Sequence, residues 1–253
     1  MNTNRLKFMN VNIDSLTAQE AVNVIDTFVQ ERTPRYVVTP NSDIVVKMQK
    51  DKELLDSCNN ADLILTDGEI VVKLASFLGK TIKERVPMTD FVWDVLNLAE
   101  DKGYKVCLFG GREDVLKKGT ERIRGRYPSL NIVDSYSPKF GFEKDENELQ
   151  VVLERLKQCN ADILLVFLGC PKQEKFLSKY HKIINIPVSI TMGGCIDFIG
   201  NDNIKRAPLW MQKAGLEWFF RFMMEPKRLF KRYFIDDMTI FPLVMKYKLG
   251  IKK

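Results

Sequence analysis

Residues 162–174 read DILLVFLGCPKQE, and this segment indicates the fold more clearly than any other part of the chain. Its apolar run, Ile163–Leu168, contains no polar residue. Such a run is typical of a strand that is buried on both faces of a parallel sheet. Glycine, proline and polar residues follow directly, and from Lys172 to Tyr180 the apolar residues recur with helical spacing. We therefore expect a buried strand, a tight turn and a helix, in that order.

The same order of strand and helix recurs along most of the chain. We expect strands at residues 36–39, 62–66, 105–109, 131–135, 162–168 and 187–191, and helices at residues 17–31, 70–78, 91–101, 115–127, 146–159 and 172–180. Alternating strands and helices predict an α/β fold, here a Rossmann-like parallel sheet with helices on both faces. In such a sheet, ligands bind at the carboxyl ends of the strands.

The composition excludes several classes of protein. Of the 253 residues, 45% are hydrophobic and 28% are charged, which excludes disordered and collagen-like chains. The five cysteines include no C-x-x-C pair, which argues against a zinc site or a disulfide framework and for a reducing compartment. His181 is the single histidine, so no metal site with two histidines can form. We expect this histidine at a solvated helix end.

Neither a signal peptide nor a membrane span is expected from the sequence. The first five residues, MNTNR, lack the apolar segment of a signal peptide. No apolar run reaches the roughly 18 residues of a membrane-spanning helix. We therefore expect a protein of the cytoplasm.

The positive charge is concentrated near the C-terminus. Residues 204–253 hold 12 lysines and arginines against 4 acidic residues, a net charge of +8, whereas residues 1–203 have a net charge of −2. The same last 50 residues carry 10 of the 26 aromatic residues. We predict two parts, an α/β body at residues 1–203 and a helical, basic appendage at residues 204–253.

Polar and glycine-rich turns follow four of the expected strands. They are Thr39-Pro40-Asn41, Asp67-Gly68, the segment 169–174, and Gly193-Gly194 with Asp197 shortly after. Because parallel strands end at the same edge of a sheet, these residues should gather around one crevice. The glycine pairs let backbone N–H groups approach a diphosphate, although tight turns after buried strands explain them equally well. Neither G-x-G-x-x-G nor the Walker pattern occurs, which disfavours a nicotinamide-dependent oxidoreductase.

Asp67 is the carboxylate of greatest interest. It ends an expected strand, and Gly68 after it frees the backbone to turn. A carboxylate in this place can act as a general base. It can equally serve as the N-cap of the helix at residues 70–78, and the sequence alone does not decide between the two roles. No D-x-D pair occurs, so this common arrangement for a metal-bound nucleotide sugar is absent from the sequence.

The appendage allows three interpretations. In residues 218–234, aromatic and basic side chains interleave at helical spacing, which fits an amphipathic element on an anionic membrane. Each lysine or arginine near such a surface contributes about 1 kcal/mol of binding free energy. The alternatives are a helix packed on its own body and a contact with nucleic acid, in which aromatic rings stack on bases. We expect no nucleic-acid partner.

Taken together, the motifs resemble those of the WecG/TagA/CpsF family of bacterial glycosyltransferases. Their order and spacing extend over nearly the whole chain, and the last two blocks are the most specific. The motifs are Thr39-Pro40-Asn41, Ala61 to Gly68, Arg85-Val86-Pro87, Gly169 to Glu174, Gly193 to Phe198, Arg206 to Trp210, and Gly215 to Trp218 with Arg221 and Glu225 to Arg228.

The resemblance implies an enzyme that transfers an N-acetylmannosamine-type sugar from a UDP-sugar donor to undecaprenyl-diphosphate-linked N-acetylglucosamine. It implies inversion at the sugar carbon, no essential metal, no cofactor, and a peripheral place on the inner face of the cytoplasmic membrane. Products of the family enter wall teichoic acid, enterobacterial common antigen or capsule. The body would hold the catalytic residues, and the appendage would touch the membrane and complete the active site. Whether copies of the chain form a homo-oligomer stays open.

The resemblance also implies roles for individual residues. Asp67 matches the family's proposed base, which would take the proton of the acceptor hydroxyl group, and Thr39 is the second residue predicted to be catalytic. Arg221 and Arg228 match tail arginines that would fold over a diphosphate, and Lys231 stands where arginine is more usual. The complete set predicted to bind substrate is Asn41, Arg85, Gln173, Gly193, Gly194, Asp197, Arg221, Arg228 and Lys231.

Two departures from the family pattern leave the donor sugar open. Met88 follows Arg-Val-Pro where glycine is usual, and no Pro-Gly follows the glycines of the segment 110–114. Glucose-type and uronic-acid-type donors therefore remain alternatives. A hypothesis from another class also remains, namely a noncatalytic module that docks on the membrane and binds UDP or a lipid diphosphate.

Overall fold

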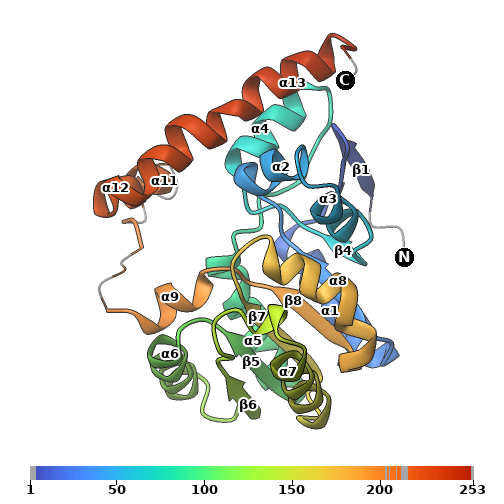
Figure 1. Ribbon diagram of the computed structural model, residues 1–253, viewed down its shortest axis with the longest axis vertical. Helices are drawn as coiled ribbons and strands as arrows, with labels where there is room; N and C mark the ends of the chain where they lie inside the picture. Colours follow the sequence, from blue (N-terminus) through green and yellow to red (C-terminus); the bar gives the residue numbers. More distant parts are fainter. Residues whose placement is uncertain (1–3, 203, 205, 209, 212–215, 252–253) are drawn as a thin grey trace.

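The centre of the protein is a six-stranded parallel sheet with the strand order β4-β3-β8-β7-β5-β6 (Figure 1). The computed structural model describes residues 4–202, 204, 206–208, 210–211 and 216–251. Each of the six expected strands is present, and each begins and ends within two residues of its expected bounds. The strands are β3 (Arg35–Val38), β4 (Leu63–Ile64), β5 (Val106–Gly110), β6 (Ile132–Tyr136), β7 (Ile163–Phe167) and β8 (Val188–Thr191). The predicted fold class is therefore confirmed.

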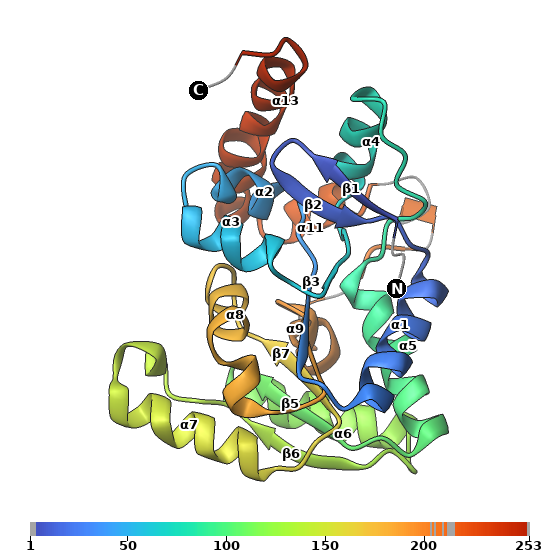
Figure 2. The same ribbon diagram turned by 90° about the vertical axis from the view of Figure 1, so that its right-hand side faces the viewer.

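Helices cover both faces of this sheet, which explains the unbroken apolar run of β7. Ile163 and Leu165 face one apolar cluster and Leu164 and Val166 face the other, because successive side chains of a strand point to opposite faces. Figure 2 shows α7 and α8 on one side of the sheet and α1 and α5 on the other. One cluster is built on α1 (Ala18–Glu31), α5 (Met88–Lys102), α6 (Glu113–Arg126) and α9 (Cys195–Gly200), and the other on α2 (Ser42–Met48), α3 (Lys52–Asn59), α7 (Glu146–Gln158) and α8 (Lys172–Ile184).

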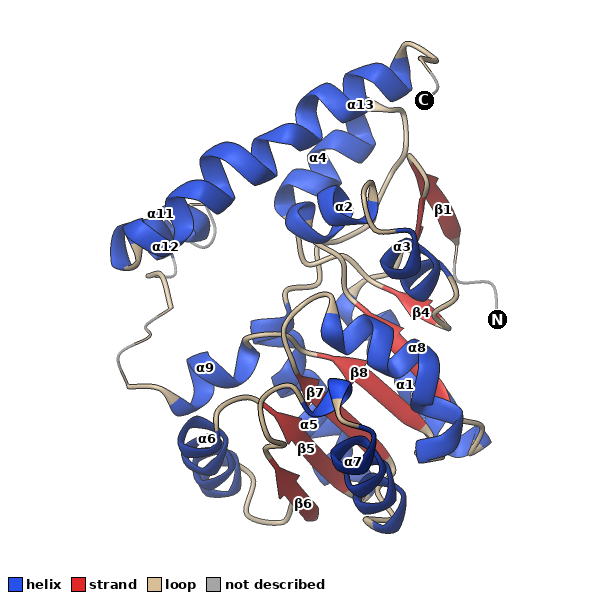
Figure 3. Ribbon diagram, in the orientation of Figure 1, coloured by secondary structure: helices blue, strands red, loops and turns tan. Residues whose placement is uncertain are grey.

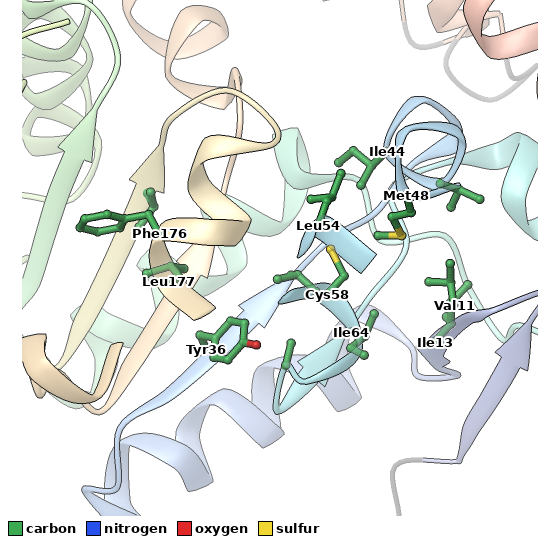
Figure 4. Packing of buried hydrophobic residues seen from close by; sticks show 14 of the residues in the cluster. Val11, Ile13, Tyr36, Ile44, Met48, Leu54, Cys58, Ile64, Phe176 and Leu177 are labelled. Atoms are coloured by element: carbon green, nitrogen blue, oxygen red, sulfur yellow. The ribbon is translucent and has the colours of Figure 1, made fainter. Parts of the chain in front are cut away.

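The sequence did not predict an N-terminal hairpin or the short helices α2 and α3. Strands β1 (Arg5–Phe8) and β2 (Val11–Asp14) pair antiparallel outside the main sheet. Asp14 ties them to the sheet, because its carboxylate accepts hydrogen bonds from Arg5 and from the Ile64 backbone N–H, each at 2.8 Å. Figure 4 shows side chains of the hairpin, α2 and α3 in one apolar cluster. These elements have four to eight residues, too few for a clear periodic pattern.

The expectation that His181 is solvated is wrong. The residue lies in α8 with 8% of its surface exposed. Its ring stands 4.7 Å from the ring of Tyr36, and its Nδ1 atom lies 2.8 Å from the carbonyl oxygen of Leu177. Helix α8 packs on β3, so this histidine faces the core although lysines flank it in the sequence.

The C-terminal segment is helical, as predicted, and packs on the rest of the chain. Its described elements are α11 (Glu217–Met224), α12 (Pro226–Lys231), the π-helical segment η2 (Arg232–Asp236), the 3₁₀ segment η3 (Asp237–Thr239) and α13 (Ile240–Lys248). Ile240 and Val244 are buried in the same apolar cluster as the side chains of α2. The Nζ group of Lys248 donates a hydrogen bond of 3.2 Å to the carbonyl oxygen of Phe77 in α4 (Glu69–Phe77). No helix among the described residues has the length and apolar character that crossing a membrane requires.

Candidate active site

A cleft of about 450 Å³ opens at the carboxyl ends of β3, β4, β7 and β8. After β3 and β7 the chain continues into helices on one face of the sheet, whereas after β8 it continues into α9 on the other face. Figure 3 shows α8 and α9 well apart from each other, and helices that diverge in this way leave a crevice between the strand ends. Eight of the eleven predicted site residues line it: Thr39, Asn41, Asp67, Gln173, Gly193, Gly194, Asp197 and Arg221.

The other three predicted residues are not part of the cleft lining. Arg85 lies between α4 and α5, with its Nε atom 3.9 Å from a carboxylate oxygen of Glu69. Lys231 ends α12 and is exposed. Arg228 belongs to α12, but its side chain lies outside the part of the chain that the structure describes.

Asp67 follows β4 and is partly accessible from the cleft. Gly68 is the N-cap residue of α4, and no side chain caps that helix, so the N-cap interpretation of Asp67 is wrong. Burial raises the pKa of the Asp67 carboxyl group above its ordinary value. The charges of Arg85 and Arg221 lower this pKa, Glu217 raises it, and a hydrogen bond from the Met88 backbone lowers it. A carboxylate with a raised pKa is a stronger base, and two cations nearby stabilise its charged form.

Thr39 and Asn41 reach the cleft from the end of β3. Thr39 is buried, and its hydroxyl group donates a hydrogen bond of 3.3 Å to the carbonyl oxygen of Thr191, which joins the ends of β3 and β8. Asn41 is the N-cap residue of α2, where its side-chain oxygen accepts a hydrogen bond of 3.1 Å from the Ile44 backbone. With that oxygen used in the cap, the Asn41 side chain can offer a ligand its amide nitrogen.

Gln173 connects the ends of β7 and β8. It lies in the first turn of α8 with 3% of its surface exposed. Its side-chain oxygen accepts a hydrogen bond of 3.0 Å from the backbone N–H of Gly193. Gly193 has a φ of +54°, a backbone conformation that glycine adopts without strain. Gly194 and Asp197 follow at the start of α9, so this side of the cleft combines a backbone turn with two polar side chains.

The C-terminal helices supply one wall of the cleft. The lining includes Arg221 and Met224 of α11, Glu225 at the C-cap of α11, and the buried Leu229 of α12. The guanidinium group of Arg221 lies 4.7 Å from the centre of the Phe198 ring, a cation–π contact that connects α11 to α9. The charge of Arg221 thereby reaches the same cleft as Asp67, although 154 positions separate them in the sequence.

Several cleft residues were missed from the sequence. Asp43 and Lys47 line the cleft from α2, and the Nζ group of Lys47 donates a hydrogen bond of 2.8 Å to Asp43. Cys170, Phe198 and Glu225 line it as well. The sequence offered one signal for Asp43 and Lys47. They follow Asn41 and stand four positions apart, which is the spacing of an ion pair on one face of a helix.

A second hollow lies between β6 and α7. Its volume is about 570 Å³, but it is shallow, and Val133, Asp134, Arg155 and Cys159 are among its lining residues. None of the predicted site residues lines it. Over the described ranges, no three histidine, cysteine, aspartate or glutamate side chains are grouped so that they could hold a metal ion. The cleft at the strand ends is therefore the stronger candidate for an active site.

The chain is similar to known proteins of one family. The model of the family described as "Glycosyl transferase WecG/TagA/CpsF family" matches residues 6–253. A protein of Bacillus subtilis (strain 168) is 31% identical over 201 residues, which are 79% of this chain and 76% of that protein. A protein of Staphylococcus aureus (strain MW2) is 28% identical over 255 residues, covering 100% of this chain and 96% of its own length. Both are named N-acetylglucosaminyldiphosphoundecaprenol N-acetyl-beta-D-mannosaminyltransferase.

Proposed function

Since the chain belongs to the WecG/TagA/CpsF family of glycosyl transferases, we propose that it moves an N-acetylmannosamine-type sugar from a UDP donor to undecaprenyl-diphosphate-linked N-acetylglucosamine. The names of the two relatives support this choice of sugar and acceptor. The observation that carries the proposal is the placement of Asp67, a carboxyl group of raised pKa that lines the cleft near Arg85 and Arg221.

In the proposed reaction, the Asp67 carboxylate takes the proton of the acceptor hydroxyl group while the hydroxyl oxygen bonds to the anomeric carbon of the donor. The bond between that carbon and the UDP oxygen breaks, and UDP leaves with both electrons of the bond. A single displacement of this kind inverts the configuration at the anomeric carbon. A positioned general base contributes typically about 10²–10⁴-fold to the rate.

The leaving UDP carries more negative charge than the bound donor, and fixed cations and N–H donors stabilise such charge. Arg221 in the cleft wall is the cation best placed for this role, and Arg85 and Lys231 are the proposed supplements. The side-chain amide groups of Asn41 and Gln173 supply N–H donors. Together with the missing D-x-D pair, these donors support a reaction that needs no metal ion or cofactor.

The direct test measures UDP release. Purified protein is mixed with UDP-N-acetylmannosamine and a short-chain lipid-diphosphate-N-acetylglucosamine acceptor, with and without EDTA. We expect release that depends on the acceptor and persists in EDTA, because protein groups rather than a metal ion compensate the charge of UDP. Loss of release in EDTA would contradict the metal-independent mechanism.

The choice of donor and the alternative function have separate outcomes in the same assay. Release with UDP-glucose or a UDP-uronic acid, but not with UDP-N-acetylmannosamine, would change the sugar and keep the reaction. Binding of UDP without transfer from any of these donors would favour a noncatalytic module that docks on the membrane.

We propose further that the appendage at 204–253 holds the protein on the inner face of the cytoplasmic membrane and completes the active site of the body at 1–203. Three aromatic rings of α11, α12 and η2 support this. The Phe222 and Phe230 rings lie 5.2 Å and 5.3 Å from the ring of Phe234, while Phe230 and Phe234 remain 54% and 46% exposed. Lys227 and Lys231, both exposed, stand between these phenylalanines in the sequence. Exposed apolar patches bordered by charge mark interaction sites, and the lipid acceptor lies in an anionic membrane.

The aromatic cluster predicts a measurable affinity for lipid. Replacing Phe230 and Phe234 together with serine is expected to weaken binding to vesicles of anionic phospholipid at least about tenfold, since each buried phenylalanine contributes about 1.5–3 kcal/mol. Sedimentation with vesicles measures the effect. Ile183→Ser on α8, where the side chain is 53% exposed, is the matched control and should bind like the wild type. Equal binding of the double variant would remove the cluster from the membrane contact.

A further inference from the structure

Glu174 is a buried carboxyl group beside the cleft that the proposed reaction does not use. It lies in the first turn of α8 with 1% of its surface exposed. One of its oxygens, Oε1, accepts a hydrogen bond of 2.9 Å from the Nε2 group of Gln173. The other, Oε2, is buried and has no hydrogen-bond partner in the part of the chain that the structure describes. Burying such a group is costly, so its presence calls for a physical reason.

The hydrogen bonds of Gln173 supply that reason. The side-chain oxygen of Gln173 accepts from the Gly193 backbone, and its nitrogen donates to Glu174. Rotating the amide by half a turn would place its NH₂ group against the Gly193 N–H and its oxygen against the Glu174 oxygen. Both pairs would then repel, so Glu174 and Gly193 select the same orientation of the amide. The second N–H of Gln173 is left to donate to a ligand in the cleft, which Gln173 lines.

We propose that Glu174 is a positioning residue, which fixes the Gln173 amide so that one N–H donor faces an oxygen of the bound substrate. The same two hydrogen bonds hold the turn at Gly193 against α8, so the ends of β7 and β8 keep a constant spacing across the cleft. The inference rests on the proposed function in one respect, namely that the oxygen belongs to a sugar or phosphate of the substrates. Preorganised donors of this kind are most effective where water is excluded.

The surroundings of Glu174 indicate which substitution should preserve its role. Burial raises the pKa of its carboxyl group, whereas the hydrogen bond from Gln173, the neighbouring Cys170 thiol and the charge of Lys47 lower it. Lys47 belongs to α2, as does Asp43, and Cys58 of α3 also lies near enough to interact. Glutamine has nearly the shape of glutamate and keeps one side-chain oxygen. Glu174→Gln therefore keeps an acceptor for Gln173, while Glu174→Met has similar length but no acceptor.

The experiment is a double-mutant cycle on kcat/KM for sugar transfer. Glu174→Gln should remain within about threefold of the wild type, and Glu174→Met should lose at least about tenfold, the effect of one buried hydrogen bond. In a Gln173→Ala background, Glu174→Met should lower kcat/KM almost no further, because the amide that Glu174 positions is gone. Glu154→Met on the exposed side of α7 is the control for the substitution itself.

A second measurement does not depend on activity. Hydrogen exchange of the Gly193 backbone N–H should be at least about tenfold faster in Glu174→Met than in the wild type and unchanged in Glu174→Gln. Equal losses of kcat/KM in Glu174→Gln and Glu174→Met would overturn the positioning role. An effect of Glu174→Met that is as large in the Gln173→Ala background as in the wild type would also overturn it. A wild type that transfers no sugar, but shows the expected exchange pattern, would refute the proposed function and leave the positioning role intact.

Discussion

Replacing Asp67 with asparagine is expected to lower the rate of sugar transfer at least about a hundredfold while the protein stays folded. The amide has almost the shape of the carboxyl group but cannot accept the proton of the acceptor hydroxyl. Asp67 lines the cleft at the end of β4, and asparagine keeps a side-chain oxygen that can accept the hydrogen bond from the Met88 backbone at the start of α5. Steady-state kcat and kcat/KM with the donor and lipid acceptor give the measurement.

The stability of Asp67→Asn separates this role from damage to the fold. Burial raises the pKa of Asp67 above its value in the unfolded chain, so the unfolded state loses its proton first as the pH rises. The stability of the wild type therefore falls as the pH rises from the unfolded pKa to the higher folded pKa, and it stays lower above that range. Asparagine carries no such cost, and we expect its melting temperature at neutral pH to equal or exceed that of the wild type.

The control for Asp67→Asn makes the same chemical change outside the cleft. Asp94 is an exposed aspartate of α5. Partial burial of its carboxyl group also raises its pKa. Asp94→Asn should transfer sugar at the wild-type rate. Undiminished transfer by Asp67→Asn itself would remove Asp67 from the base role, and the acidic limb of the pH–rate profile would then belong to another group.

Arg221→Gln is expected to reduce kcat about a hundredfold, similar to the loss of one preorganised donor from a site that stabilises developing charge. Its guanidinium group reaches the cleft from α11 and presents a planar set of N–H donors that suits phosphate oxygens. Arg221→Lys keeps the charge but not the planar donors, so its loss should be intermediate. The same assay of UDP release measures all three proteins.

A second consequence of Arg221→Gln concerns Asp67. Arg221 lowers the pKa of Asp67, so the pKa of Asp67 rises when the arginine is removed. The acidic limb of the profile of kcat/KM against pH should then move to higher pH. Lys227→Gln removes one exposed positive charge from α12, outside the cleft lining, and should change neither kcat nor the profile. An Arg221→Gln variant with the activity of Lys227→Gln would show that the C-terminal helices do not complete the site.

Much of the sheet and cleft could be predicted because local signals were strong. Apolar runs such as Ile163–Leu168 reported strands buried on both faces, and parallel strands must end at one edge. From that rule, the sequence alone predicted one crevice lined by Thr39, Asn41, Asp67 and Gln173. The elements that escaped prediction, such as the hairpin and α2, are short and lack a full period.

Other features depended on contacts between distant parts of the chain. His181 and Glu174 are polar residues of a helix that also contains lysines, and this composition predicts exposed side chains. Both are buried, because α8 packs on β3 and borders the cleft. The capping role of Asp67 was excluded only when the backbone showed Gly68 at the start of α4. Arg221 reached the cleft through the packing of the C-terminal helices, in which Leu229 and Ile240 are buried.

The sequence by itself determined the α/β fold, the edge of the sheet that carries the cleft and most of the residues around it, because strand burial and chain direction leave a periodic pattern in the residues themselves. Only the tertiary structure decided which carboxyl groups are buried, which cations stand near Asp67 and how Glu174, Gln173 and Gly193 hold one another. These depend on desolvation and on distances between residues far apart in the chain, and periodicity contains no information on either.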